Sequence, residues 1–204
     1  MEQIFRHAYQ RNIWGDPESA SGPGSGLIRT ATFRDQIPQL LTELGASSLL
    51  DAGCGDFNWM KELELPVRQY IGIDIVPELI ARNTQNYSGG GRSFVHGNIV
   101  DDALPRMDVI LCRDCLVHFS FADAWAALRN FKRGRSRYLL TTTFIEFPNN
   151  FDIGTGGWRQ LNLQRPPFGF PPPEKSIDEK CLHTGGIYAD KRLALWRLED
   201  ITDD

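Results

Sequence analysis

Short apolar runs and helically spaced apolar positions alternate along the middle of the chain. The runs typical of buried strands lie at residues 48–52, 70–75, 93–96, 109–112 and 138–143. Helical spacing occurs at 57–65, 77–87 and 121–131, and also at 27–44, where Pro38 interrupts the pattern so that we expect one or two helices. This alternation predicts a mostly parallel sheet with helices on both faces.

The two ends of the chain depart from this alternation. We expect residues 1–45 to form an N-terminal cap with a small-residue loop, whereas residues 148–180 are rich in glycine and proline and lack a clear period. Irregular stretches of more than about fifteen residues inside a domain are usually functional loops, so we interpret 148–180 as a substrate lid. Strand-like residues at 186–188 and 192–198 predict an antiparallel C-terminal hairpin, which brings the sheet to seven strands.

The length and composition are those of one globular domain. The chain has 204 residues, of which 41% are hydrophobic and 24% charged, near the average for a globular protein. We therefore expect a single domain over residues 1–204. The first ten residues contain no apolar run of the signal-peptide type, and no stretch approaches the length of a membrane span, so we expect a cytoplasmic protein that has no membrane partner.

The net charge and the cysteine content limit which partners and metals we expect. The net charge of -4 gives no diffuse basic field, and the short basic turn at 132–137 has no aromatic platform, so we do not expect nucleic acid as a partner. Four cysteines are too few and too scattered for a disulfide scaffold, and Cys112 and Cys115 have no second pair at zinc-finger spacing. We expect free thiols and no metal site. The sequence leaves the oligomeric state open.

Candidate chemistry lies at the carboxyl end of the first strand, where ligands bind in open parallel sheets. Gly53 and Gly55 follow this strand and allow the backbone to turn sharply and to approach a ligand closely. Asp51 stands at the strand end, and Asp74 ends the second strand, where a carboxylate can accept both hydroxyls of a ribose. This constellation predicts a cofactor with a nucleoside at this edge of the sheet.

The same geometry serves nicotinamide cofactors, and two residues separate the two cofactor classes. The dinucleotide fingerprint places a third glycine three residues after the second, where this chain has Asn58. Asp56 follows Gly55 directly, where a pyrophosphate needs backbone N–H groups and no competing carboxylate. A cofactor with a cationic sulfonium and an amino group tolerates that acidity better, and the pattern favours it.

At these residues the chain resembles the class I S-adenosylmethionine-dependent methyltransferases. Residues 49–55 look like their first motif, 70–74 like their second, 97–101 like their adenine-side loop, and 107–119 like their fourth strand and the following turn. The resemblance implies a Rossmann-like fold, S-adenosylmethionine as cofactor and S-adenosylhomocysteine as product. It also implies that the residue at 74 binds the ribose hydroxyls and that those at 98 and 99 flank the adenine. The expected cofactor contacts are Asp51, Gly53, Gly55, Asp74, Ile75, Asn98, Ile99 and Arg113.

One position departs from the family pattern. The third glycine that is common in the first motif is here Phe57, so either its side chain points away from the cofactor or the loop differs. Phe57 also belongs to a narrower pattern that resembles a bacterial subgroup of these enzymes. That pattern comprises residues 14–15, 18–19, 21–25, 54–59, 112–119 and 158–163. The subgroup resemblance carries no information about the substrate.

Methyl transfer to a hydroxyl needs an aligned acceptor and the removal of a proton. His118 follows the fourth strand on the rim that carries the cofactor, and imidazole titrates near neutral pH, which makes it the candidate base. The competing interpretation is a structural histidine that caps the helix beginning near Phe121. Asp114, in the same turn, could hold the methionine amino group, orient the histidine or cap a turn. We assign His118 and Asp114 to catalysis.

The acceptor is expected under the 148–180 lid. Arg159 and Arg165 suit a carboxylate or phosphate, because guanidinium groups bind such oxyanions in bidentate fashion. The competing interpretation is that this segment only plugs the end of the core. The loop at 21–26 could fold over the cofactor's carboxylate or over the acceptor. The expected acceptor contacts are Trp14, Ser21, Trp158, Arg159, Asn162 and Arg165.

These expectations combine into one function, the transfer of a methyl group from S-adenosylmethionine to a small, anionic or sugar-like acceptor at oxygen. Oxygen is favoured over nitrogen by His118 as base and by the lack of an Asn-Pro-Pro-Tyr signature in the sequence. Methylation of a protein or RNA stays open and would be favoured if the basic turn at 132–137 were contiguous with the pocket. A non-catalytic domain that binds the cofactor and a nicotinamide oxidoreductase also stay open.

Overall fold

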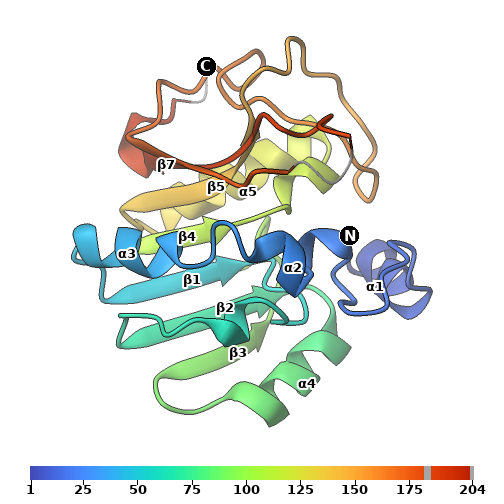
Figure 1. Cartoon of the computed structure of the whole chain (residues 1–204), viewed down its shortest axis with the longest axis vertical. Coiled ribbons are helices and arrows are strands. Elements are labelled where there is room, and N and C mark those ends of the chain that lie inside the picture. Colours follow the sequence, from blue (N-terminus) through green and yellow to red (C-terminus); the bar gives the residue numbers. More distant parts are fainter. Residues whose placement is uncertain (182–184, 203–204) are drawn as a thin grey trace.

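The structure is a computed structural model that describes residues 1–181 and 185–202. Within these residues a seven-stranded sheet forms the centre (Figure 1). Its strands are, in spatial order, β3 (Arg92–His96), β2 (Gln69–Asp74), β1 (Ser48–Ala52), β4 (Val109–Cys112), β5 (Tyr138–Phe144), β7 (Lys191–Arg197) and β6 (Lys175–Asp178). The neighbours from β3 to β5 are parallel, whereas β7 is antiparallel to both β5 and β6. The predicted fold class, a mostly parallel seven-stranded sheet with an antiparallel C-terminal pair, is confirmed.

Helices cover both faces of the sheet, as predicted, because successive residues of its buried strands point to opposite sides. Leu49 of β1 packs with Ile37 and Leu41 of α3, whereas Leu50 packs in the cluster that contains Ala127 and Leu128 of α5. The helices are α1 (Glu2–Gln10), α2 (Leu27–Thr30), α3 (Gln36–Glu43), α4 (Pro77–Tyr87) and α5 (Phe121–Arg133). None of the helices in the described ranges is long and apolar enough to cross a membrane.

The strand order reverses at β1, which fixes the place of the site. The chain runs from β1 outward to β2 and β3, then returns to β4 on the other side of β1. The connections that leave the carboxyl ends of β1 and β4 therefore diverge and leave a crevice between them, where open α/β sheets bind ligands.

One helix prediction was wrong in detail, whereas the expectation of one or two helices over residues 27–44 is confirmed by α2 and α3. The segment 57–65 contains only the short 3-10 helix Met60–Glu62, because Phe57 has a left-handed backbone (φ 60°) that a continuous α-helix does not contain. Pro38 does not interrupt a helix but lies in the first turn of α3, where the missing N–H would have no intrahelical partner. Further 3-10 turns lie at Pro23–Ser25, Leu116–His118 and Leu198–Asp200.

The C-terminal pair is antiparallel as predicted, but its first strand is different. Residues 186–188 form a turn, in which Tyr188 makes a single bridge to Cys181, and β6 pairs with β7 instead. β6 lies inside the segment predicted to be irregular, since of its four residues only Ile177 is buried. One buried residue leaves too little alternation for a strand prediction. The predicted 148–180 segment therefore ends in a strand, and residues 182–184 lie outside the described part.

The sequence analysis did not identify α1, which lies beside the carboxyl ends of the parallel strands (Figure 1). Phe5 and Ala8 are its buried residues, and Ile4 on the same helix contacts the backbone of Gly156 so closely that a side chain there would collide. Arg6 Nε donates to Glu78 Oε1 of α4 at 2.7 Å. The helix is thus packed against segments that are distant in sequence.

The segment before β6 is built into the core. Leu161, Leu163, Phe168 and Phe170 belong to the apolar cluster on the α5 side of the sheet, and Trp125 of α5 stacks on Phe168 with ring centroids 5.3 Å apart. The interpretation that this segment plugs the end of the core therefore describes residues 161–170.

Arg159 anchors the same segment to the turn that follows β4. Its Nη1 donates to the carbonyl oxygens of Leu116 and Val117 at 3.2 and 3.0 Å, and its Nε donates to the carbonyl of Phe151 at 3.1 Å. The side chain is 1% exposed, and its guanidinium lies over the ring of Phe121. Arg159 thus donates to backbone carbonyls through Nε and Nη1, whereas its Nη2 is buried without a hydrogen-bond partner.

We predict that Arg159→Met destabilises the protein by about 2–3 kcal/mol, because a charged donor bonded to buried carbonyls contributes roughly that amount and its loss leaves the acceptors without partners. Urea unfolding followed by circular dichroism measures the change. Arg165→Met, at an exposed position in the same segment, is the matched control and should be neutral. Equal stability of the two variants would contradict the anchoring role.

Candidate active site

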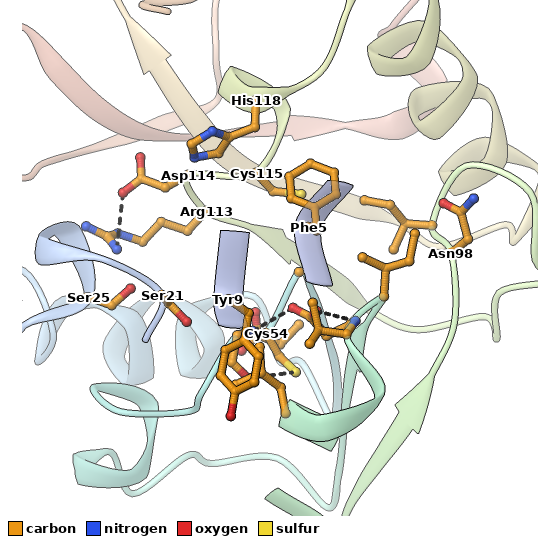
Figure 2. A pocket seen from close by; sticks show the side chains of 18 of the residues that line it. Phe5, Tyr9, Ser21, Ser25, Cys54, Asn98, Arg113, Asp114, Cys115 and His118 are labelled. Atoms are coloured by element: carbon orange, nitrogen blue, oxygen red, sulfur yellow. Dashed lines mark hydrogen bonds and ion pairs between the residues drawn. The ribbon is translucent and has the colours of Figure 1, made fainter. Parts of the chain in front are cut away.

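An open pocket of about 950 Å³ lies at the carboxyl ends of β1, β2 and β4 (Figure 2). Twelve of the sixteen residues predicted for the site line it. They are Asp51, Gly53, Gly55, Asp74, Ile75, Asn98, Ile99, Arg113, Asp114, His118, Trp14 and Ser21.

The two glycines after β1 are required by close contacts. Both have positive φ, 82° at Gly53 and 56° at Gly55. A Cβ on Gly53 would lie 2.9 Å from Cys115 Sγ, and a Cβ on Gly55 would lie 2.1 Å from Ser21 Oγ. The turn after β1 is therefore packed closely between the N-terminal loop and the residues after β4, and only glycine fits at these two positions.

Phe57 resolves the departure from the family pattern, since its side chain points away from the pocket. It is 1% exposed and lies in an aromatic cluster with Tyr70, Tyr87 and Phe94, whose ring centroids are 5.1–5.4 Å from its own. Its φ of 60° retains the left-handed backbone that a glycine would adopt easily. The packing of the ring offsets the backbone strain.

Asp74 is fixed by backbone amides at the end of β2. Gly55 N–H donates to its Oδ2 and Val76 N–H to its Oδ1, both at 2.9 Å. Burial raises the pKa of Asp74, and these two amide bonds oppose the rise. Each oxygen keeps further lone pairs, so the carboxylate is oriented and can still accept two hydroxyls.

Asp51 is buried in the pocket wall and is hydrogen-bonded to one neighbouring side chain. The Tyr70 hydroxyl donates to its Oδ2 at 2.6 Å. Burial raises the pKa of Asp51 to about 7, with the carboxylate of Asp74 adding to the rise and the Tyr70 hydrogen bond opposing it. Near neutral pH this carboxyl group is therefore poised to lose its proton when a cation approaches.

Asp56 plays a different part from the one expected. It does not line the pocket but accepts hydrogen bonds from the hydroxyl of Ser19, the N–H of Ala20 and the hydroxyl of Ser21 at 2.8–3.2 Å. The argument that its charge would face a bound pyrophosphate was therefore wrong. Its buried carboxylate holds the N-terminal loop on the turn after β1, which places Ser21 above Gly55.

His118 has a defined tautomer. Its Nδ1 lies 2.7 Å from the carbonyl oxygen of Gly157, which can only accept, so the ring proton is on Nδ1 and Nε2 carries a lone pair. Burial lowers the pKa of His118, and the ring packs against Phe5 and Trp14. The capping interpretation was wrong, because Ser120 caps α5 through Asp123 N–H.

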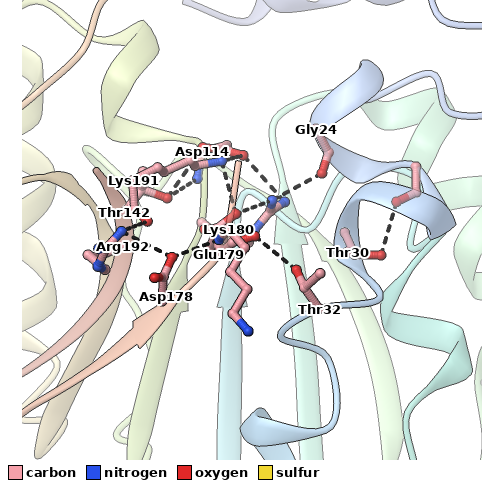
Figure 3. A network of polar contacts seen from close by, with 12 residues as sticks. Gly24, Thr30, Thr32, Asp114, Thr142, Asp178, Glu179, Lys180, Lys191 and Arg192 are labelled. Carbon is pink, nitrogen blue, oxygen red and sulfur yellow. Dashed lines mark hydrogen bonds and ion pairs between the residues drawn. The ribbon is translucent and has the colours of Figure 1, made fainter. Parts of the chain in front are cut away.

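A buried network of charges surrounds Asp114 (Figure 3). Lys191 Nζ lies 2.6 Å and Arg113 Nη1 3.3 Å from Asp114 Oδ2. Burial alone would raise the pKa of Asp114, but the attraction of Lys191 and Arg113 outweighs it and holds this pKa well below its usual range. Glu179 Oε2 accepts from Arg113 Nη2 at 2.7 Å and lies 3.1 Å from Lys191 Nζ.

Sequence reasoning missed Lys191 and Glu179 because neither belongs to a motif. Only the antiparallel pairing of β7 with β5 and of β6 with β7 brings them near the turn after β4. Sequence reasoning also missed Phe5 and Tyr9 of α1, which line the pocket. Their signal was present, since Phe5, Ala8 and Tyr9 recur at helical spacing. The remaining unpredicted lining residues are Met1, Ser25, Cys54, Trp59, Val76, Leu79, Gly97, Cys115 and Phe119.

Four residues expected to contact the acceptor do not line the pocket, namely Trp158, Arg159, Asn162 and Arg165. Arg159 is committed to carbonyls, and Asn162 Nδ2 donates to two further carbonyls at 3.0 and 3.2 Å. Trp158 packs on Tyr188 with ring centroids 5.2 Å apart, and Arg165 is exposed. The two arginines therefore give no support to an anionic acceptor.

The basic turn lies away from the pocket. Arg135 and Arg137 line a separate hollow, at the amino ends of β4 and β5, that shares no residue with the pocket. The other basic residues of this hollow are Arg106, Lys132 and Arg197. The contiguity that would favour a macromolecular acceptor is not present. All four cysteines have free thiols, as expected.

Comparison with protein-family models gives one match. Residues 50–134 match a protein-family model described as a methyltransferase domain. This match includes the turn after β1, Asp74, the residues at 98 and 99, and the turn that carries His118. No curated protein matches the chain by sequence.

Solved structures agree on the fold. The magnesium protoporphyrin IX methyltransferase of Synechocystis PCC 6803 with bound S-adenosylhomocysteine has a TM-score of 0.55 and 17% identity, covering 76% of this chain and 83% of that one. The N-methyltransferase NodS of Bradyrhizobium japonicum WM9, also with S-adenosylhomocysteine, has a TM-score of 0.55 and 16% identity over 69% and 74%. These structures show the fold of the class I methyltransferases, and together with the match over residues 50–134 they support a methyltransferase that uses S-adenosylmethionine.

We predict that Phe57→Ala costs about 3–5 kcal/mol of stability, because it empties a packed aromatic site and leaves a side chain at positive φ. Phe57→Gly should cost about 1 kcal/mol less, since glycine adopts this backbone without strain. Paired urea unfolding curves measure the difference. An alanine variant at least as stable as the glycine variant would show that the backbone at this position is not strained.

Proposed function

We propose that this methyltransferase methylates a hydroxyl group of a small, polyhydroxylated acceptor, with His118 as the general base. The observation that carries the proposal is the Nδ1–H bond of His118 to the Gly157 carbonyl, which leaves Nε2 unprotonated. A base with its lone pair in the pocket suits a hydroxyl acceptor, which must lose a proton as its oxygen is methylated.

The residues present fit the cofactor. Gly53 and Gly55 leave the space that a Cβ would fill, and the amide-held carboxylate of Asp74 suits two ribose hydroxyls. Asp51 suits a cationic group, because its carboxyl is buried and the repulsion from Asp74 outweighs the attraction of Arg113. When bound, S-adenosylmethionine supplies an electrophilic methyl group on a sulfonium sulfur.

The proton goes to His118 as the new bond forms. Nε2 of His118 would take the hydroxyl proton of the acceptor, while the cofactor, held by Gly53, Gly55 and Asp74, would supply the methyl group and leave as S-adenosylhomocysteine. The resulting imidazolium is stabilised by the Gly157 carbonyl at Nδ1 and by the nearby negative charge of Asp114. Release of the proton to water restores the neutral ring, the form that burial favours.

Asp114 is assigned a different part, because a carboxylate whose pKa is held well below its usual range is a weak base. It is still a strong hydrogen-bond acceptor. Both cations lie on Oδ2, and Oδ1 has only a 3.4 Å contact with the Thr142 hydroxyl. A second hydroxyl of the acceptor would donate to Oδ1 while the reacting one donates to His118. Two neighbouring hydroxyls are typical of sugars and related polyols.

The acceptor is a small molecule in this proposal because α1 and the N-terminal loop cover the pocket. Phe5 and Tyr9 line it from one side, and Trp14 and Ser21 from another. We further propose that residues 1–204 act as one methyltransferase domain. The cap at 1–45 contributes pocket walls, and the 148–180 segment contributes the carbonyl that orients His118.

The test measures S-adenosylhomocysteine released from S-adenosylmethionine with pools of sugars, polyols, phenols and amines. We expect turnover with a polyol or sugar, a loss of about 10²- to 10⁴-fold in rate in His118→Gln with cofactor affinity unchanged, and a roughly 10- to 100-fold loss of affinity in Asp74→Ala. His7→Gln and Asp35→Ala, at exposed positions outside the pocket, are the matched controls. Full activity of His118→Gln, or transfer to amines alone, would show the proposal to be wrong.

Cofactor affinity should rise with pH through about 7, the pKa of Asp51. Below this value Asp51 is protonated and offers no charge to the cationic cofactor, whereas above it the carboxylate is ionised and affinity levels off. Isothermal titration calorimetry with S-adenosylmethionine between pH 5.5 and 8.5, roughly 1.5 units on either side of the pKa, measures this profile. Asp51→Asn should flatten it, and Tyr70→Phe should move it to higher pH. A profile unchanged in Asp51→Asn would assign the effect to another group.

A further inference from the structure

Four charged side chains form a closed, buried network beside the pocket, which we call the quartet: Arg113, Asp114, Glu179 and Lys191. Two successive residues come from the turn after β4, one follows β6 and one begins β7. Three of their side chains are 1–7% exposed, and Asp114 is 27% exposed on the side that lines the pocket. Two cations and two carboxylates make the quartet electroneutral.

Attachment of the C-terminal strands to the rest of the sheet does not by itself account for the quartet. Desolvation offsets most of the attraction between buried charges, so such a cluster is weak evidence for a purely stabilising role. Two of its atoms, Glu179 Oε1 and Arg113 Nε, are buried without a hydrogen-bond partner, which adds to its cost. Both cations lie on Oδ2 of Asp114 and on Oε2 of Glu179, and of these two carboxylates only Asp114 lines the pocket.

We propose that Lys191 and Glu179 are positioning residues of the active site, which hold Asp114 in place as an ionised acceptor and balance the charge that His118 experiences. This inference rests on the proposed function for the meaning of the two pocket residues. Lys191 pulls Oδ2 toward β7, so that Oδ1 is left for the pocket. Glu179 neutralises the second positive charge, which would otherwise oppose proton uptake by His118.

The charges around His118 determine whether a substitution in the quartet raises or lowers its pKa. Asp114 favours its protonated form, whereas Arg159 and Lys191 oppose it. The α1 and N-terminal loop sides present the uncharged rings of Phe5 and Trp14. Loss of Lys191 leaves the quartet with a net negative charge and should raise the pKa of His118. Loss of Glu179 leaves a net positive charge and should lower it.

The experiment is an NMR titration of the full chain, labelled with ¹³C in histidine and saturated with S-adenosylhomocysteine. His118→Gln assigns the resonance among the four histidines of the chain. Lys191→Met and Glu179→Gln are compared with the natural protein, together with Lys191→Arg, which keeps the charge. Lys175→Met and Glu43→Gln make the same chemical changes at an exposed ion pair on β6 and α3 and are the matched controls.

We expect the pKa of His118 to rise in Lys191→Met, to fall in Glu179→Gln and to stay unchanged in Lys191→Arg and in both controls. If the quartet had only a structural role, the expected result would differ. Either substitution would loosen the quartet and admit water to the His118 ring, whose pKa is lowered by burial. The pKa of His118 would then rise in both Lys191→Met and Glu179→Gln. Shifts in the same direction, or no shift, would overturn the proposal.

If either single variant fails to fold, the double variant Lys191→Met/Glu179→Gln keeps the remaining pair electroneutral and carries the test. Its His118 pKa should lie near that of the natural protein, and a displacement beyond the range of the control variants would overturn the proposal. The titration reports on the protein itself and uses no acceptor. Failure of the polyol assignment would therefore leave this result standing, and the reverse is also true.

Discussion

The buried carboxylate of Asp56 is the interaction on which the site depends. By accepting hydrogen bonds from Ser19, Ala20 and Ser21 it fixes the N-terminal loop on the turn after β1. That placement puts Ser21 against Gly55 and brings the Gly24 carbonyl within 3.0 Å of Arg113 Nη2. The parallel sheet thus supplies the floor of the pocket, and one carboxylate below the turn determines what covers it.

Local patterns were enough to predict the floor. β1, β2, β4 and β5 are largely buried strands. Asp51 and Asp74 at the ends of β1 and β2, and Asp114 just after β4, lie at the common edge because parallel strands end there together. The half of the pocket that is built from strand ends could therefore be predicted from the sequence. Phe57 shows the limit of motif comparison, since only packing against three other aromatic rings explains a large residue at a left-handed position.

Contacts between segments that are distant in the sequence could not be predicted from it. Arg159 carries the same charge and the same hydrogen-bonding groups whether it faces an acceptor or three carbonyls, and only the fold chooses the carbonyls. Lys191 and Glu179 likewise become part of the site through the pairing of β6 with β7, and β6 offers a single buried residue as its signal. Long-range ion pairs and hydrogen bonds leave no periodicity along the chain, which is why sequence reasoning assigned Arg159 to an acceptor and overlooked Lys191 and Glu179.

The electrostatics divide the pocket into two parts. Asp51 and Asp74 are buried with few cations near them, so their pKa values are raised and their ionisation is favoured by an incoming positive charge. Asp114 already has two cations on one oxygen and needs no ligand to stay ionised. The first two are therefore suited to a cationic cofactor, which lowers their pKa as it binds. Because Asp114 carries its own counter-charges, it can accept a hydrogen bond from a neutral donor in every state of the pocket, and the neighbouring His118, the proposed base, is held by burial in its neutral form.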